Sequence, residues 1–428
     1  MNILERARAV VKQLRTLAAR SLWDWRRCPQ CGSTWTIKNG SYRRRRWTFR
    51  GRETVRVQRH LCYQCGRSYS EESAWLVRGS WYERAVHRCA VDYWMHGRMS
   101  LRRVAEFARS QLGRQERWMM WHLLDEPGSQ EWCLLSASTV HHWLDRCGIE
   151  AQRSVGGQLE GIACSGQMGT DGLWARLRGG SKRVVLALVD SVSGLLWPPV
   201  VVKDEERAVS WRRLFERAQS AGLVLDLLEG ITSDGAQGLE SYLRQALRGV
   251  HQQRCIWHLW RGLGGKIAQQ VGRAVADLAT EKAKEARKHL RGELVGLLRA
   301  IFDAPSFSQG EQALAKLAEH SLGKSLAQYL LPLLDAALIH LLPCHKGLLR
   351  VSPEWCWRDF RQRLSRGRNH GSEQRLERAA LVWAIYHNFT PAQMRRECKR
   401  HYRHPGQSPL EVAGNPPGEL SYLDALAV

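Results

Sequence analysis

Four cysteines near the amino terminus place the strongest constraint on how this chain can fold. They form two Cys-x-x-Cys pairs, Cys28 with Cys31 and Cys62 with Cys65, separated by thirty residues. This spacing is typical of a tetrahedral zinc site in which each pair turns the backbone around the metal. Because four thiolates leave no open coordination position, the pattern predicts a structural zinc ion and a zinc ribbon over residues 28–70.

The segment between the two cysteine pairs is rich in arginine and contains several aromatic residues. Residues Thr54 to His60 alternate apolar and basic side chains, as a half-exposed strand does. Guanidinium groups on such a strand would face the phosphates of a nucleic acid. We therefore expect DNA contacts from the arginines of this segment, which are Arg43, Arg44, Arg45, Arg46, Arg50, Arg52, Arg56 and Arg59.

Charge over the whole chain points to the same class of partner. The 428 residues contain 65 Lys and Arg against 41 Asp and Glu, a formal net charge of +24. Residues 1–78 alone hold 18 basic and 5 acidic residues, a net charge of +13. Such an excess attracts polyanions, and nucleic acid is the partner we expect.

The same inspection bears on cellular location. No stretch approaches the roughly 20 apolar residues that cross a bilayer, so we expect no membrane partner. Residues 1–27 lack the apolar segment of a secretory signal and are typical of a basic amphipathic helix. We therefore expect a cytoplasmic, nucleoid-associated protein whose twelve cysteines are reduced.

Residues 80–150 have helical periodicity. Ser100 can cap a helix that buries Leu101, Val104 and Ala108, and a second short element begins at Ser136. The pair is similar to a helix-turn-helix, although the connecting segment is far longer than an ordinary turn. We expect a helical DNA-binding region of this kind, with a plain helical linker as the alternative.

The rest of the chain alternates strands and helices, which indicates an α/β core interrupted by helices. We expect core segments at residues 159–262 and 346–392, a helical insertion at 263–345 and a tail at 393–428. The expected strands are Val184 to Val189, Leu195 to Val202, Leu223 to Ile231 and Arg254 to His258, and the expected helices are residues 205–220, Leu239 to Leu247 and Glu373 to Phe389.

Three acidic residues stand at points where an α/β sheet places its ligands. Asp171 lies in a strand that opens the core, Asp234 follows a predicted strand, and Glu373 begins the last long helix. Acids at strand ends of an open sheet point into the crevice where ligands bind. Two alternatives stay open, since Asp190 also ends an apolar strand and Glu377 lies one turn beyond Glu373 on the same helix face.

With these acids in place, the sequence resembles the DDE transposases of bacterial insertion sequences, in particular the Mutator-like group. The resemblance covers nearly the whole chain and includes the pair Cys255-x-x-His258 and the tail from His404 to Gly414. It implies a multidomain α/β protein with an RNase H-like catalytic core and an all-helical insertion. It also implies that Asp171, Asp234 and Glu373 are catalytic.

The chemistry expected of such an enzyme is Mg²⁺-dependent DNA strand cleavage and strand transfer. Two Mg²⁺ ions, or Mn²⁺, would be held by Asp171, Asp234 and Glu373, because hard cations prefer carboxylate oxygens. Cys255 and His258 are half of a ligand set for a second metal, but a role in supporting the catalytic face is the interpretation we favour.

The resemblance also implies partners and leaves two rival functions. The expected partners are the terminal inverted repeats of the element, the target DNA and a second copy of the chain, as a homodimer or higher oligomer. One rival is a metal-dependent nuclease of the same fold that only hydrolyses DNA. The other is a non-catalytic zinc-ribbon DNA-binding protein derived from a transposase.

Overall fold

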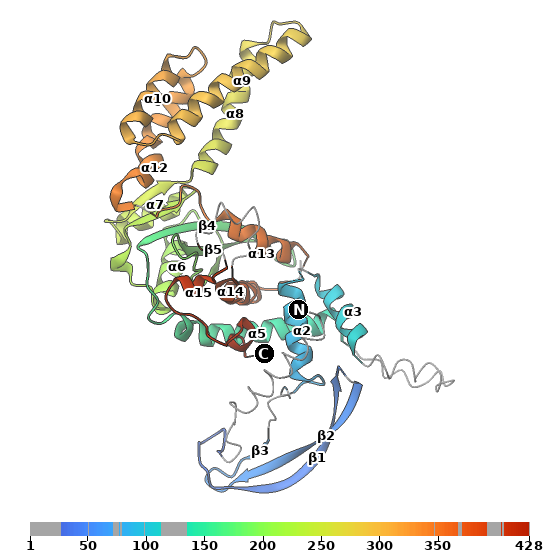
Figure 1. The fold of residues 1–428 in the computed structure, drawn as a ribbon. Helices are drawn as coiled ribbons and strands as arrows, with labels where there is room; N and C mark the ends of the chain where they lie inside the picture. Colours follow the sequence, from blue (N-terminus) through green and yellow to red (C-terminus); the bar gives the residue numbers. More distant parts are fainter. Residues whose placement is uncertain are drawn as a thin grey trace. The chain divides into compact units, whose positions relative to one another are not determined.

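In a computed structural model, the chain forms two compact units, residues 1–146 and residues 147–427. Figure 1 shows the elements of both units, coloured along the sequence. The structure describes residues 27–49, 51–71, 77, 79–97, 99–112, 135–345, 347–366, 370–391, 404 and 406–427. The basic helix expected over residues 1–27, except its last residue, and Arg50 lie outside the described residues.

The first unit contains a three-stranded antiparallel sheet in the order β1-β2-β3. Its strands are β1 (Thr36–Thr48), β2 (Gly51–Cys62) and β3 (Ser68–Ser70). The predicted strand over Thr54 to His60 lies within β2. The pairing of β1 with β2 shifts between Lys38 and Ser41, where a bulge interrupts the ladder.

Three helices follow the small sheet, α2 (Arg84–Met95), α3 (Leu101–Gln111) and α5 (Ala137–Leu159). Ser100 caps α3 as predicted, because its hydroxyl accepts a hydrogen bond of 3.3 Å from the Arg103 N–H. The prediction of a second short element was wrong in length. Helix α5 begins after Ser136 but runs for 23 residues, through Gly148, into the second unit.

The second unit is built on a five-stranded mixed sheet in the order β6-β5-β4-β7-β8. Strands β6, β5 and β4 are antiparallel, whereas β7 and β8 run parallel to β4. This mixed α/β arrangement is consistent with the RNase H-like core that the sequence predicts. The strands are β4 (Gln167–Arg176), β5 (Lys182–Asp190), β6 (Val200–Val202), β7 (Gly230–Ser233) and β8 (His251–Arg254).

Helices α6 (Ala208–Ser220) and α7 (Gln237–Ala246) share one buried core with the sheet, which includes Trp197, Trp211 and Phe215. Helices α13 (Glu354–Arg366) and α14 (Glu373–Phe389) contact β4, β5 and β6. The bounds of α14 agree with the prediction. The last short helices, α15 (Pro409–Val412) and α16 (Tyr422–Ala425), contact α14.

Three predicted strands differ from the structure. Of the predicted strand Leu195 to Val202, only Val200–Val202 is strand, because Pro198 and Pro199 cannot donate hydrogen bonds to a ladder. The segment from Leu223 begins with a single helical turn, η1 (Leu225–Leu227), and only Gly230–Ser233 is strand. The predicted strand from Arg254 to His258 was wrong, because β8 ends at Arg254 and helix α8 begins at Ile256. A short apolar run does not distinguish a buried strand from the first turn of a buried helix.

Residues 256–345 are helical and have a hydrophobic core of their own, formed by residues such as Leu263, Leu298 and Leu317. In Figure 1 the long helices α8 and α9 (yellow) extend away from the sheet. The helices are α8 (Ile256–Ala274), α9 (Thr280–Phe302), α10 (Phe307–Glu319), α11 (Lys324–Leu330) and α12 (Leu334–Leu338), with short 3-10 turns η2 (Leu331–Leu333), η3 (Ile339–Leu341) and η4 (Pro343–His345). Within the part of the chain that the structure describes, no helix is long and apolar enough to cross a membrane.

Candidate metal centres

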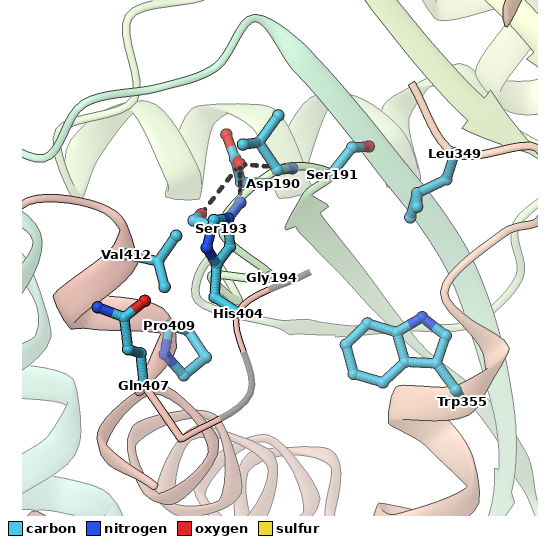
Figure 2. A pocket seen from close by; sticks show the side chains of 11 residues that line it. Asp190, Ser191, Ser193, Gly194, Leu349, Trp355, His404, Gln407, Pro409 and Val412 are labelled. Atoms are coloured by element: carbon cyan, nitrogen blue, oxygen red, sulfur yellow. Dashed lines mark hydrogen bonds between the residues drawn. The ribbon is translucent and has the colours of Figure 1, made fainter. Parts of the chain in front are cut away.

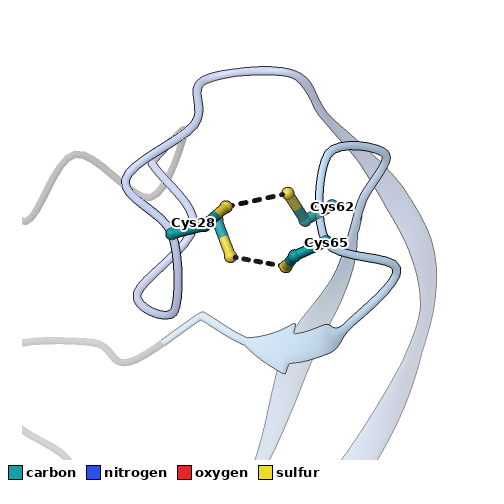
Figure 3. Close-up of side chains that lie close together, drawn as sticks. Cys28, Cys62 and Cys65 are labelled. Atoms are coloured by element: carbon teal, nitrogen blue, oxygen red, sulfur yellow. Dashed lines mark hydrogen bonds between the residues drawn. The ribbon is translucent and has the colours of Figure 1, made fainter.

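The four amino-terminal cysteines come together in one cluster, shown in Figure 3. The sulfurs of Cys28 and Cys65 lie 3.6 Å apart, and so do those of Cys31 and Cys62. Four thiolates bound at about 2.3 Å in a tetrahedron have sulfurs roughly 3.8 Å apart. The cluster could therefore hold zinc, which is consistent with a zinc ribbon.

The thiols of the cluster differ in acidity. Burial raises the pKa of Cys28, but hydrogen bonds from the backbone at Gln30 and Cys31 and from neighbouring thiols outweigh it and lower that pKa to about 7. The backbone at Ser33 lowers the pKa of Cys31, yet burial and the neighbouring thiols raise it to about 12. Neighbouring thiolates repel one another, and a bound cation would offset this repulsion.

The arginines expected to contact DNA divide between the two faces of β1, because successive strand residues point in opposite directions. Arg43 and Arg45 are exposed, and Arg56 of β2 pairs with Arg43 on the same face. Arg44 donates a hydrogen bond of 3.2 Å to the Ser80 carbonyl.

Arg46 corrects the expectation that all four consecutive arginines face DNA. Its side chain is only 2% exposed, and its guanidinium donates to the carbonyl of Arg45. Of the other arginines in that set, Arg59 is exposed and Arg52 is half-buried.

The second cluster is formed by Asp171, Asp234 and His258, whose candidate ligand atoms all lie within 4.8 Å of one another. Strand register explains the proximity of the two acids. Gly169 of β4 pairs with Thr232 of β7 in the parallel ladder, so the positions two residues later are Asp171 and Asp234. His258 reaches the same place from the first turn of α8.

Asp171 is buried, with only 6% of its surface exposed. Burial raises the pKa of Asp171 well above its usual range, and the negative charge of Asp234 raises it further, while His258 lowers it. The carboxylate of Asp234 accepts a hydrogen bond of 3.1 Å from the Ala236 N–H. Two close carboxylates with so little compensation are costly without a cation, so their geometry fits a divalent metal.

Cys255 and His258, to which the sequence assigned a supporting role, make different contacts in the structure. Cys255 is the residue before α8, and its buried sulfur accepts a 3.2 Å hydrogen bond from the Ser352 N–H. His258 belongs to the group with the two acids. Burial lowers the pKa of its imidazole, but the Cys255 thiol and the charges of Asp171 and Asp234 outweigh burial and raise that pKa. An imidazole nitrogen beside two carboxylates is a donor set that suits Mn²⁺ as well as Mg²⁺.

Asp190, the alternative first acid, has a different function in the structure. Its carboxylate accepts hydrogen bonds from the backbone N–H groups of Ser165, Val192 and Ser193 and from the Ser193 hydroxyl. Figure 2 shows the bonds from Val192 and Ser193 in a pocket that also includes Trp355, His404 and Gln407. Its oxygens hold the turn between β5 and β6 in place, which leaves Asp171 as the acid beside Asp234.

Glu373 and Glu377 both face arginines rather than the pair of aspartates. Glu373 forms an ion pair with Arg183 of β5 and is 38% exposed. Glu377 is buried and accepts from Arg213 and Arg217, each at 2.9 Å, and from the Val201 N–H. The structure places neither glutamate within the Asp171, Asp234 and His258 group.

Sequence reasoning overlooked two further acids near this group. Glu354, at the start of α13, raises the pKa of Asp171, and the charge of Asp234 raises the pKa of Glu205 beyond the effect of burial. Glu354 follows no predicted strand, so no pattern singled it out. Glu205 comes three residues after the predicted strand Leu195 to Val202 and begins the predicted helix over residues 205–220, and this position was the signal that could have identified it.

The comparisons with known proteins agree with the arrangement of the second unit. Residues 199–346 match the family described as "Transposase, Mutator family". The match includes Asp234, Cys255, His258 and the helices α8 to α12, but ends before Glu373 and begins after Asp171. No curated protein was found to match. The chain therefore contains a transposase domain of the Mutator family, which implies DNA binding and a part in DNA transposition.

Proposed function

We propose that this protein is a DDE transposase that binds the terminal inverted repeats of its element and catalyses DNA strand cleavage and strand transfer. One observation carries the proposal. In a chain with a net charge of +24, Asp171 and Asp234 lie together with no ion-pair partner among the described residues. Arginines pair with Glu373 and Glu377, but no arginine within the described ranges forms an ion pair with Asp171 or Asp234.

The chain's own residues would perform three tasks in this reaction. Asp171 and Asp234, with His258, would hold a divalent cation at the carboxyl end of β7. Bound cations would activate the attacking water or 3′-hydroxyl and stabilise the leaving oxygen of the phosphodiester. The rigid parallel pairing of β4 with β7 fixes the spacing of the two carboxylates before DNA arrives.

Glu373 is the third acid that we propose. Glu377 is fixed by three donors, two of them arginines, and is committed to joining α14 with α6. Glu373 has one arginine partner and is more exposed, so it can exchange Arg183 for a cation at lower cost.

DNA would be bound by the exposed face of the ribbon and by the helices of the first unit. Arg43, Arg45 and Arg56 offer guanidinium groups to phosphates. Two element ends must be brought together in one reaction, so we propose that the protein acts as a homodimer or higher oligomer.

A cleavage and strand-transfer assay tests the proposal. The purified protein would be incubated with Mg²⁺ or Mn²⁺, a duplex ending in the inverted repeat that flanks its gene, and a supercoiled target plasmid. Joined products are expected from the wild type, and cutting without joining would instead support the nuclease. No cutting, together with binding to the repeat, would support the non-catalytic DNA-binding protein.

A further inference from the structure

The carboxylate of Glu205 lies against β4 at Gly172, the residue that follows Asp171. Its Oε1 accepts a hydrogen bond of 3.0 Å from the indole Nε1 of Trp174. Its Oε2 covers Gly172, where an added Cβ would lie only 2.1 Å from that oxygen. Because Gly172 has no side chain, the Glu205 carboxylate has room at this position.

The backbone at Glu205 is held from two sides. The Glu205 carbonyl accepts a hydrogen bond of 2.7 Å from Nε1 of the buried Trp211 in α6. From α7, Gly238 approaches so closely that an added Cβ would lie 2.4 Å from the same carbonyl oxygen. The position of the carboxylate is therefore a consequence of core packing rather than of a free surface loop.

Glu205 also lacks the compensation that its neighbours have. Asp204 pairs with Arg207 at 2.6 Å, whereas Glu205 has no ion-pair partner among the described residues. Burial raises the pKa of Glu205 and the charge of Asp234 raises it further, while Trp174 and His258 lower it. Strand alternation places Glu205 over the face of β4 opposite to that of Asp171, and Glu205 lies outside the 4.8 Å group of Asp171, Asp234 and His258. The charge of Asp234 raises the pKa of both Asp171 and Glu205.

We propose that Glu205 is a further carboxylate ligand of the divalent cations bound at Asp171, Asp234 and His258, a proposal that rests on the proposed function. A half-buried carboxylate with one neutral donor is costly beside Asp234, and a cation removes that cost. Trp174 is a positioning residue, because its N–H holds the Glu205 carboxylate against β4 beside Gly172. With Glu205 the centre has enough oxygen ligands for two cations without requiring Glu373 in the DNA-free protein.

The test is a Mn²⁺ titration of the zinc-loaded full-length protein without DNA, with free Mn²⁺ measured by electron paramagnetic resonance. Glu205→Gln should raise the Mn²⁺ concentration for half-saturation by about tenfold or more. Glu206→Gln removes the same charge one residue away, from an exposed side chain, and should change it by less than about twofold. Trp174→Phe, which keeps a ring but removes the donor, should have an intermediate effect.

Thermal unfolding separates a ligand from a structural residue. Glutamine can still accept from Trp174 and no longer repels Asp234, so metal-free Glu205→Gln should melt no lower than the wild type. Mn²⁺ should raise its melting temperature less than that of the wild type. A lower melting temperature with wild-type Mn²⁺ affinity would overturn the inference and make Glu205 structural.

Asp234→Asn distinguishes failure of this inference from failure of the proposed function. If Asp234→Asn loses Mn²⁺ binding but Glu205→Gln retains it, the inference is wrong and the proposed function stands. If Asp234→Asn binds Mn²⁺ like the wild type, the cation centre itself is wrong.

Discussion

The two candidate metal centres of this chain are built in opposite ways. The cysteine cluster comes from two short turns within 38 residues, and Gly32 and Gly66 adopt the left-handed backbone conformation that those turns need, with φ of 74° and 67°. The acidic centre brings Asp171, Asp234 and His258 together from two strands and a helix. Local spacing specifies the first, whereas strand register specifies the second.

The centres also differ in how completely the protein satisfies a metal. Four thiolates complete a tetrahedron and leave nothing for a substrate. Two carboxylates and an imidazole leave positions open for water and phosphate oxygens. This difference predicts that loss of the first metal removes structure, whereas loss of the second removes chemistry.

Removing zinc should have the largest effect. Cys62→Ser should release one zinc ion per chain and unfold the ribbon, because metal binding contributes on the order of 10 kcal/mol to folding of such small modules. Zinc content by atomic absorption and the circular dichroism spectrum would be measured before and after chelation. Release of no zinc, or release without loss of β-structure, would contradict a structural role.

Asp234→Asn should abolish catalysis and leave the fold intact, the opposite of zinc removal. The side-chain volume is kept, but a charge is lost where cations must be held together, so cleavage should fall by about a thousandfold, equivalent to about 4 kcal/mol. Repeat binding in a gel-shift assay and zinc content should not change, and Asp171→Asn should behave alike. Wild-type cleavage by Asp234→Asn in Mg²⁺ would refute the catalytic assignment and leave the DNA-binding alternative.

The two glutamates of α14 provide a sharper version of the same contrast. Glu377→Gln weakens a buried pairing with Arg213 and Arg217 and should reduce the free energy of unfolding by about 2 kcal/mol. Glu373→Gln removes an exposed ion pair and should change stability by less than about 1 kcal/mol while cleavage is lost. Urea unfolding and single-turnover cleavage would be measured on both variants. If Glu377→Gln loses cleavage and Glu373→Gln loses stability instead, Glu377 is the third acid.

How far the sequence could predict the molecule depends on the range of the interactions involved. Helix α14 was located correctly because Ser372 caps its first turn and Pro391 follows its end. The second acid was placed correctly at a strand end, yet β8 and the start of α8 were confused, since Cys255, Ile256 and Trp257 form a short apolar run.

Side-chain surroundings were beyond the reach of the sequence. Asp190 and Asp171 both lie in or at the end of strands, and only the structure shows that Asp190 is occupied by the turn that follows it. Glu205 attracted no attention because its significance depends on Gly172, thirty-three residues away in the chain. Strand pairing determines which residues lie next to each other, and local sequence patterns do not predict that pairing.

The smallest expected effect concerns the surface beside the zinc cluster and completes the contrast between structure and chemistry within one strand. Arg43 and Arg45 are exposed on one face of β1, whereas Arg46 is buried. Replacing Arg43 and Arg45 with Ala should weaken binding to all DNA sequences and flatten the slope of log K against log salt by up to about 0.9 for each lost phosphate contact. Arg46→Ala should leave the slope unchanged and lower the melting temperature of the ribbon, because it removes packing around a buried side chain. Both variants would be titrated with duplex DNA at several salt concentrations by fluorescence anisotropy. A slope that falls for Arg46→Ala but not for the double variant would mean that DNA contacts the other face of the strand.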